Sequence, residues 1–349
     1  MSRAARLQTP VQAPGRPLSG PPVIKTVALH AGVSVATVSR VLNESAPVAE
    51  ATREQVRRSV EALGYQTNHL ARNLRTSATG LVLVTVPDLR NPFYGRIVEG
   101  ITSRLQQDGY LMVLEDTGPA TEASGRSLSL IGQRKVDGAI CLDPATVHRS
   151  LADDLVDLPW VACCEYDRST SVPFVGIDNE AAARDAVRHL VRRGARRIAL
   201  INYDERFLFA QQRRTGYQAA LADAGIAFDP GLIHTVDGLG YEEGAGALRR
   251  LMELCAPPQA VFAVSDTLAI GALRAAASLG LRVPQDLAVV GFDDIDVAAH
   301  VWPPLTTVAQ PMEVLGRSAA DLVIQRIREP SRPARSLTLR HELRIRSSA

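Results

Sequence analysis

From residue 80 onward, short runs of consecutive apolar residues alternate with longer stretches in which apolar residues recur every three or four positions. Continuous Val, Ile, Leu and Ala runs predict strands that are buried on both faces, and the amphipathic stretches predict helices between them. The predicted strands span 81–86, 111–115, 138–142, 160–164, 175–177, 197–201, 260–263, 287–292, 305–309 and 336–346. The predicted helices span 93–107, 122–134, 182–193, 211–224, 241–253, 266–279 and 312–327, with a further helical stretch between 142 and 160.

Alternation of this kind predicts parallel sheets with helices on both faces. The rhythm occurs twice, over about a hundred residues each time, so we expect two doubly wound subdomains with a cleft between them. The first subdomain is predicted at about 80–178 and 310–335, and the second at about 179–309 and 336–349. The stretch at 336–346 is expected to be one last edge strand.

Residues 22–67 have a different pattern, that of three short helices. Gly32 suits a tight turn, and Ser34 can cap the helix that follows it. On that helix Val38, Val41 and Leu42 form an apolar stripe. The remaining positions are small, hydroxylated or basic: Val35, Ala36, Thr37, Ser39 and Arg40. A helix-turn-helix with such an outer face can enter a DNA major groove. The alternative interpretation is an ordinary amphipathic helix, which would have the same apolar stripe.

The segments on either side of these helices are polar. Residues 1–21 are rich in Pro, Gly, Ser and Arg, which predicts a disordered tail. Residues 68–79 have weak helical spacing and are predicted to be a linker that folds only against a partner. If that partner is DNA, Leu74 suits a wedge in the minor groove, with Arg75 beside it.

Charge is distributed unevenly along the 349-residue chain. Residues 1–79 carry ten Lys or Arg and four Asp or Glu, a net charge of +6, whereas the remainder carries a net charge of −4. A basic end on an acidic body is typical of a protein whose end meets nucleic acid. The four Cys and seven His residues have no metal-ligand spacing, so neither a metal nor another cofactor is predicted. No signal peptide or membrane-length apolar run occurs, which favours a cytoplasmic protein.

Taken together, the motifs resemble those of the lactose-repressor (LacI/GalR) family of bacterial transcription regulators. In the head, the resemblance lies in residues 31–34, 37–43, 52–53 and 64–65, and in Asn68, Ala71 and Leu74. In the body, it lies in residues 91–94, 136–138, 177–179, 214–217, 265–266, 290–294 and 303–310. Within the family, the body is somewhat similar to the cytidine-repressor branch. Two helix caps depart from the family pattern, because Val23 and Ala49 stand where capping residues are usual.

The resemblance implies an all-α helix-turn-helix head and an α/β body of periplasmic-binding-protein type. It implies that Val35, Ala36 and Arg40 read bases, and that the hinge contacts the minor groove. The full set of expected DNA contacts is Thr26, Ser34, Val35, Ala36, Thr37, Ser39, Arg40, Asn43, Asn68, Ala71, Leu74 and Arg75.

For the cleft, the resemblance implies a small polar effector, gripped by Arg214 and Asp293 from two sides. An arginine only donates hydrogen bonds and an ionised aspartate only accepts them, so the pair suits vicinal hydroxyls. The expected effector contacts are Phe93, Tyr94, Glu165, Arg214, Leu239, Ser265, Asp266, Asp293 and Met312. For Asp266, helix capping is as plausible as ligand contact.

The expected function is therefore ligand-controlled, sequence-specific repression of a carbohydrate or nucleoside operon, without enzymatic activity. The expected partners are operator DNA, a sugar or nucleoside effector and a second copy of the chain, and no membrane. A homodimer is favoured over a tetramer because no heptad repeat follows Arg346. The alternative is a solute-binding protein or a sugar- or nucleoside-processing enzyme with an unrelated basic head; a turnover assay separates the two.

Overall fold

The computed structural model describes residues 22–43, 46–65, 78–118, 135–143, 158–165, 172–333 and 335–349. The chain forms two compact units, Met1–Thr76 and Ser77–Ala349, which we call the head and the body. The predicted tail, the linker residues 68–77, the predicted helix 122–134 and most of the stretch between 142 and 160 lie outside the described residues.

The head is built from α1 (Ile24–His30), α2 (Val35–Asn43) and α3 (Glu50–Leu63). Its core consists of small apolar side chains at helical spacing: Val27, Ala28, Ala31, Val38, Val41 and Val56. Gly64 ends α3 in the left-handed conformation, with φ of 59°, which costs glycine little. As the sequence indicates, α1 and α3 begin without a side-chain cap, at Val23 and Ala49.

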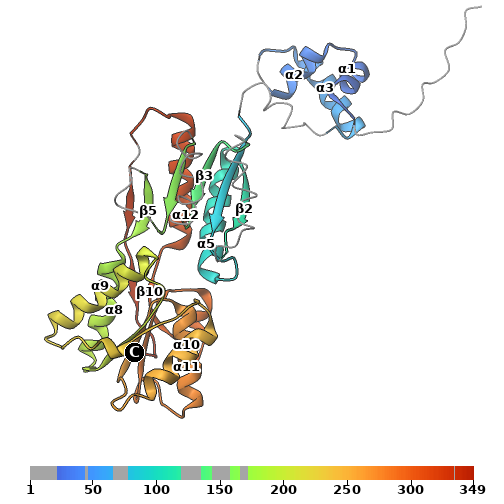
Figure 1. The fold of residues 1–349 in the computed structure, drawn as a ribbon. Helices are drawn as coiled ribbons and strands as arrows, with labels where there is room; N and C mark the ends of the chain where they lie inside the picture. Colours follow the sequence, from blue (N-terminus) through green and yellow to red (C-terminus); the bar gives the residue numbers. More distant parts are fainter. Residues whose placement is uncertain are drawn as a thin grey trace, which may run out of the picture. The chain divides into compact units, whose positions relative to one another are not determined.

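The first lobe of the body contains a six-stranded parallel sheet in the order β11-β5-β4-β3-β1-β2. Its strands are β1 (Leu81–Val86), β2 (Leu111–Asp116), β3 (Gly138–Cys141), β4 (Trp160–Cys163), β5 (Phe174–Ile177) and β11 (Leu337–Leu339). Helices α5 (Pro92–Gln107) and α12 (Met312–Arg328) pack against each other beside this sheet (Figure 1). A Cβ on Gly316 would lie 2.1 Å from the Ile97 carbonyl oxygen, so this close contact requires glycine.

The second lobe repeats the plan with the strand order β12-β10-β9-β8-β6-β7, in which only β12 is antiparallel to its neighbour. Its strands are β6 (Ile198–Asn202), β7 (Ile233–Thr235), β8 (Ala260–Ala263), β9 (Ala288–Asp293), β10 (Thr306–Ala309) and β12 (Glu342–Arg344). Two helix pairs flank this sheet in Figure 1: α8 (Asn179–Arg192) with α9 (Leu208–Asp223), and α10 (Tyr241–Met252) with α11 (Asp266–Ser278). The predicted α/β body with two doubly wound sheets is confirmed.

The chain crosses between the lobes three times: from β5 to α8, from β10 to α12, and from β11 to β12. The last crossing corrects the prediction of a single edge strand over 336–346. Leu337–Leu339 pairs with β5 in the first sheet, whereas Glu342–Arg344 pairs with β10 in the second. Between them His341 contacts Asp185 of α8 at 3.0 Å. Period-two alternation in a sequence predicts a strand but does not identify the neighbouring strand with which it pairs. Two three-residue strands on different sheets can therefore look like one longer strand in the sequence.

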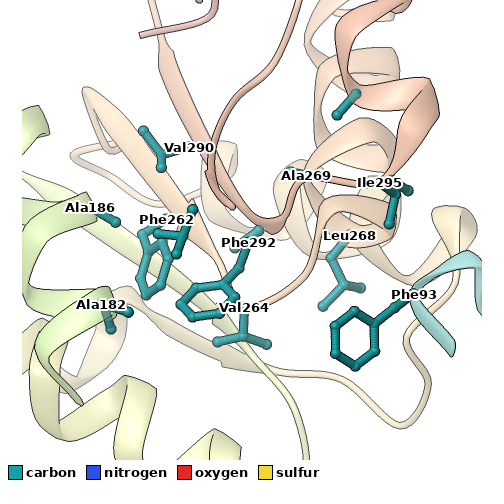
Figure 2. Packing of buried hydrophobic residues seen from close by; sticks show 14 of the residues in the cluster. Phe93, Ala182, Ala186, Phe262, Val264, Leu268, Ala269, Val290, Phe292 and Ile295 are labelled. Carbon is teal, nitrogen blue, oxygen red and sulfur yellow. The ribbon is translucent and has the colours of Figure 1, made fainter. Parts of the chain in front are cut away.

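Apolar packing links the two lobes near the crossings. Phe93 of α5 belongs to the same buried cluster as Val264 and Leu268 of the second lobe, and Figure 2 shows its ring beside them. Deeper in the second lobe, the rings of Phe262 and Phe292 lie 6.4 Å apart between centroids. The two lobes therefore share one buried apolar cluster on the interior side of the interlobe region.

Candidate functional sites

Helix α2 has one buried and one exposed face. Val38 is fully buried and Val41 nearly so, whereas Val35 is 40% exposed and Ala36 and Arg40 are also exposed. Ser34 Oγ accepts a hydrogen bond from the Thr37 backbone N–H at 3.1 Å, which caps the helix as the sequence predicts. The exposed face therefore carries two small side chains and one guanidinium.

Other residues predicted to contact DNA have varied positions. Thr26, Thr37 and Ser39 are partly exposed, and Asn43 is the last residue of α2. Asn68, Ala71, Leu74 and Arg75 lie outside the described residues. On α3, Arg53 and Arg58 form ion pairs with Glu50 and Glu54, but no carboxylate in the described part of the head pairs with Arg40. The charge of Arg40 is therefore not neutralised by those carboxylates.

A cleft of about 950 Å³ lies between the two lobes of the body. Its walls come from the loops that follow β1, β3 and β4 in the first lobe, and β6, β7 and β8 in the second. This is the carboxyl edge of both parallel sheets, where ligands bind in doubly wound folds. A second cavity, of about 30 Å³, shares Asn91, Tyr94, Leu142, Glu165, Phe209 and Leu239 with this cleft, and we call it the deep end. Its other lining residues are Phe93, Cys164, Arg213, Val264, Ser265, Asp293 and Gln310.

Arg213 and Asp293 face each other at the deep end, with 3.9 Å between Nη1 and Oδ1. Gln310 Nε2 donates to the same Asp293 oxygen at 2.8 Å. Burial raises the pKa of Asp293 despite the nearby guanidinium, and burial lowers the pKa of Arg213. Asp293 also has a φ of 122°, a conformation that non-glycine residues adopt only where the surroundings enforce it.

The Arg213 side chain makes two hydrogen bonds and two aromatic contacts within the second lobe. Its Nε donates to Asn179 Oδ1 at 3.0 Å, and its Nη1 donates to the Val264 carbonyl. The guanidinium carbon lies 3.5 Å from the centroid of the Phe292 ring and 4.9 Å from that of Phe209. These contacts fix the guanidinium plane and leave the Nη2 hydrogens without a hydrogen bond among the described residues. A preorganised donor of this kind suits a hydroxyl ligand.

The structure places Arg213, and not Arg214, at the cleft. Arg214 binds Glu205 Oε1 at 2.6 Å and does not line the cleft. Adjacent helix residues point about 100° apart, so an error of one position moves a side chain off the site. The buried residues of α9 include Ala210, Arg213 and Tyr217. That helical spacing was a signal for Arg213 in the sequence alone.

Asp293 and five other predicted effector contacts line the deep end. The five are Phe93, Tyr94, Glu165, Leu239 and Ser265. Two do not line the cleft. Asp266 is buried behind it, where its carboxylate accepts hydrogen bonds from the Ile295 N–H and the Thr307 hydroxyl. Met312 is buried in the core as the first residue of α12.

Sequence reasoning missed several residues that line the cleft, namely Asn91, Tyr203, Phe207, Phe209 and Gln310. Asn91 also caps α5, since its Oδ1 accepts from the Phe93 N–H at 3.1 Å. The three aromatic residues follow β6 within seven positions, and that density was a usable signal. Within the described residues, no three His, Cys, Asp or Glu side chains are grouped so as to hold a metal ion.

The comparisons with known proteins agree with this architecture. A family model described as bacterial regulatory proteins, lacI family, matches residues 23–68, and one for a periplasmic binding protein-like domain matches residues 187–349. The HTH-type transcriptional repressor CytR of Escherichia coli strain K12 is 36% identical over 326 residues, covering 93% of this chain and 95% of CytR. The chain belongs to the lacI family of bacterial regulatory proteins. The predicted family membership is thereby confirmed.

Other lacI-family proteins are similar over the same extent. The HTH-type transcriptional regulator CelR of Thermobifida fusca is 38% identical over 342 residues, covering 94% of this chain and 98% of CelR. A solved CelR–cellobiose complex covers 94% of this chain, and this chain covers all of it, with a TM-score of 0.71 and 34% identity. A Lac repressor dimer bound to operator and the anti-inducer ONPF gives a TM-score of 0.84 at 27% identity, with coverage of 94% and 99%.

As a family member this chain is a DNA-binding transcriptional regulator. None of the described helices combines the length and apolar character needed to cross a bilayer.

Proposed function

We propose that this protein is a dimeric repressor of a carbohydrate or nucleoside operon, and that a small effector in the interlobe cleft controls its affinity for operator DNA. The proposal includes a cytoplasmic location, where the DNA is, and no catalytic turnover. It rests most directly on α2, which buries Val38 and Val41 and exposes Val35, Ala36 and Arg40.

The exposed face of α2 suits direct readout of a major groove. Small side chains at positions 35 and 36 allow the helix to approach base edges closely, and their methyl groups can contact the thymine methyl. Arg40 can donate two hydrogen bonds to guanine O6 and N7. Thr37 and Ser39 supply hydroxyls for phosphate contacts, which set the position of the helix without specifying sequence.

The deep end of the cleft suits an effector with adjacent hydroxyls. Arg213 donates from one side while Asp293 accepts from the other, and Phe93 and Tyr94 form an apolar wall beside them. A solved structure of the related CelR is a complex with cellobiose, which supports a sugar as one ligand class. Ribose operon repressors among the relatives also support a sugar-related operon.

A dimer would read two half-sites related by two-fold symmetry. The similar Lac repressor structure is a dimer on its operator. In this chain Trp302 is 90% exposed on the loop between β9 and β10. Exposed apolar side chains of this size are typical of an interface.

Effector control follows from the three crossings between the lobes. A ligand that contacts Arg213 of the second lobe and Tyr94 of the first stabilises one separation of the lobes over another. By linkage, it changes operator affinity by the same factor by which operator DNA changes ligand affinity.

Enrichment of fragmented genomic DNA on the immobilised full-length protein tests the proposal. We expect a small set of fragments with near-palindromic sequences, and sugars or nucleosides that alter their retention. Uniform recovery of all fragments, with or without these compounds, would exclude it. A turnover assay on the compounds that alter retention tests the enzyme alternative, and product formation would favour that alternative.

A further inference from the structure

Two adjacent cysteines lie where β4 ends: Cys163 is the last residue of the strand and Cys164 is the next residue of the chain. We call them the cysteine pair. Successive side chains of a strand point to opposite faces of the sheet, so the side chains of adjacent residues normally lie apart. Here the two Sγ atoms are only 3.7 Å apart. The cysteine pair therefore departs from strand geometry.

The backbone of Cys164 brings the two thiols together. Its φ is 71°, in the left-handed region that a residue with a side chain adopts only at a cost in free energy. The Glu165 N–H donates to the Cys163 carbonyl oxygen at 2.9 Å. A hydrogen bond between residues two apart, around a central residue of positive φ, defines a rare and strained γ-turn. Such strain persists only where the surrounding structure holds it, so the thiol contact is imposed by the fold.

Only one thiol of the cysteine pair can be reached from the cleft. Cys163 is fully buried, whereas Cys164 is partly exposed and lines the deep end. The deep end has a volume of about 30 Å³, which is room for about one or two water molecules. Hydrogen peroxide is of that size, whereas oxidised glutathione is many times larger. Cys164 is therefore the thiol that meets a small oxidant, and Cys163 lies within reach of the product.

The other two cysteines have different surroundings. Burial raises the pKa of Cys141 to about 12, so its thiol stays protonated. Cys255 is exposed, between α10 and β8. The pKa of Cys164 is also raised, first by the contact with Cys163 and then by burial, while Arg213 acts in the opposite direction. The Cys164 thiolate is therefore a minor species near neutral pH, and its oxidation should be slow.

We propose that hydrogen peroxide converts the cysteine pair into a reversible disulfide, so that these two residues are an oxidative modification site. The Cys164 thiolate attacks one peroxide oxygen: an S–O bond forms, the O–O bond breaks, and the departing hydroxide takes up a proton to become water. Cys163 then attacks Sγ of this sulfenic acid: the S–S bond forms, the S–O bond breaks, and the Cys163 proton leaves with the hydroxide as a second water. The two sulfurs are oxidised by two electrons in total, and the peroxide is reduced by two.

A disulfide between adjacent residues should be easy to reverse. Adjacent Cα atoms are about 3.8 Å apart, closer than the roughly 4.4–6.8 Å that disulfides usually span. The disulfide of the cysteine pair is therefore strained, and strained disulfides are readily reduced by other thiols. By forming it, Cys163 also protects Cys164 from further, irreversible oxidation.

Oxidation should break a contact between the two lobes. The disulfide closes a small ring that contains the peptide bond between the two cysteines, and the carbonyl of that peptide accepts the Glu165 N–H. Closure of the ring therefore reorients the turn that carries Glu165. In the reduced protein Glu165 Oε1 accepts a hydrogen bond from the Phe209 N–H of the other lobe at 2.8 Å. The oxidised protein should lose this bond, which, where the proposed function holds, also changes operator affinity.

Peptide mass spectrometry of the full-length protein after peroxide treatment tests the modification site. We expect the peptide that contains Cys163 and Cys164 to lose about 2 Da, the mass of two hydrogen atoms, and dithiothreitol to restore it. Oxidised glutathione at the same concentration should leave this peptide unchanged, because it is too large for the deep end. Backbone hydrogen exchange at Phe209 should be at least about tenfold faster in the oxidised protein, since a hydrogen bond to a carboxylate is lost.

Variants separate the roles of the two thiols. In Cys163→Ser the thiol that closes the ring is gone, so Cys164 should stop at the sulfenic acid, which dimedone traps as an adduct. In Cys164→Ser this peptide should not react with peroxide. Cys255→Ser is the matched control, because it removes an exposed thiol and should leave the mass loss unchanged. The wild-type measurement decides on the disulfide even if a variant of the cysteine pair fails to fold.

The proposal is wrong if the wild-type protein keeps both thiols of the cysteine pair at about ten times the peroxide concentration that oxidises Cys255. It is also wrong if either thiol forms its disulfide with Cys141 instead. Disulfide formation without faster exchange at Phe209 contradicts the predicted loss of the contact between the lobes. Failure of the proposed function leaves both measurements unaffected, since neither uses DNA or an effector, so the two failures are distinguishable.

Discussion

The backbone N–H of Phe209 donates a 2.8 Å hydrogen bond to Glu165 Oε1, and this bond joins the two lobes of the body. Phe209 lies in the first turn of α9, a helix whose N-cap residue, Phe207, provides no side-chain cap. The carboxylate that caps α9 therefore comes from the opposite lobe, at the deep end of the cleft. Separation of the lobes would leave this helix end without that partner.

Substitution of Glu165 should change the pH dependence of stability. Burial raises the pKa of Glu165 to about 7 in the folded protein, from a usual value of 4.5. Because the folded state holds the proton more tightly, this group stabilises the fold fully below pH 4.5, and its contribution is lost as pH rises to about 7. In the wild-type protein Glu165 should therefore contribute about 1–3 kcal/mol of pH-dependent change to the free energy of unfolding between pH 5 and 8. In Glu165→Gln this contribution should be absent when unfolding by urea is measured over that range.

Glu180→Gln is the control for that experiment, since it removes an exposed carboxylate from the first turn of α8. Its free energy of unfolding should follow the wild-type pH profile. The prediction is wrong if Glu165→Gln and wild-type protein lose stability in parallel over this pH range.

Two adjacent arginines on α9 should differ in their effect on the effector response. Arg213→Lys keeps the positive charge but loses the planar donor fork that contacts Asn179 and Val264. We expect at least about a tenfold higher effector concentration for half-maximal change in operator binding, or about 1.4 kcal/mol. Arg214→Lys should be within about twofold of wild type. If Arg214→Lys weakens the effector response and Arg213→Lys does not, Arg214 is the effector contact after all.

Glycines at helix contacts should be intolerant of any side chain. A Cβ on Gly244 of α10 would lie 2.1 Å from the Leu268 carbonyl oxygen of α11, whereas a Cβ on Gly246 meets nothing within 4 Å. Gly244→Ala should destabilise the body by about 1–3 kcal/mol, because the helices must move apart. Gly246→Ala should be neutral or stabilise by about 0.5–1 kcal/mol. Equal midpoints of thermal unfolding for the two variants would contradict the packing described here.

The sequence predicts those helices and strands that have a long, regular pattern of apolar residues. The second helix of the head, the parallel strands and the principal helices of the body were predicted in the right order. Ile233–Thr235 was missed, because a strand of two half-exposed residues and one exposed residue has too little pattern to detect. Helix starts were placed up to three residues late, as at Asn179 and Leu208, since their first turns lack apolar spacing.

The cleft was predicted less completely than the fold. Asp293 and Glu165 were predicted from the resemblance to the family, and both follow predicted strands, at the edge where sites of this fold lie. Arg214 was chosen from a motif in which Arg213 is the adjacent residue, and only the helical phase of α9 separates them. Asp266 illustrates the limit, because a buried carboxylate that satisfies Ile295 and Thr307 looks the same in sequence as one that binds a ligand.

Arg40→Ala should abolish sequence discrimination by the head. The exposed guanidinium can make a bidentate contact with guanine, which is worth about 1–3 kcal/mol per base pair and occurs once in each half-site. Binding through the remaining basic residues should persist and weaken steeply with salt. Arg58→Ala is the matched control, since Arg58 lies on α3 and pairs with Glu54.

The most direct test of the account is fluorescence anisotropy of the full-length protein with an enriched genomic fragment and with a shuffled duplex of equal composition. We expect wild-type protein to prefer the genomic fragment by at least about a thousandfold at physiological salt, and Arg40→Ala to bind both duplexes equally and weakly. Equal affinity of the wild-type protein for the two duplexes, or full discrimination by Arg40→Ala, would contradict the account.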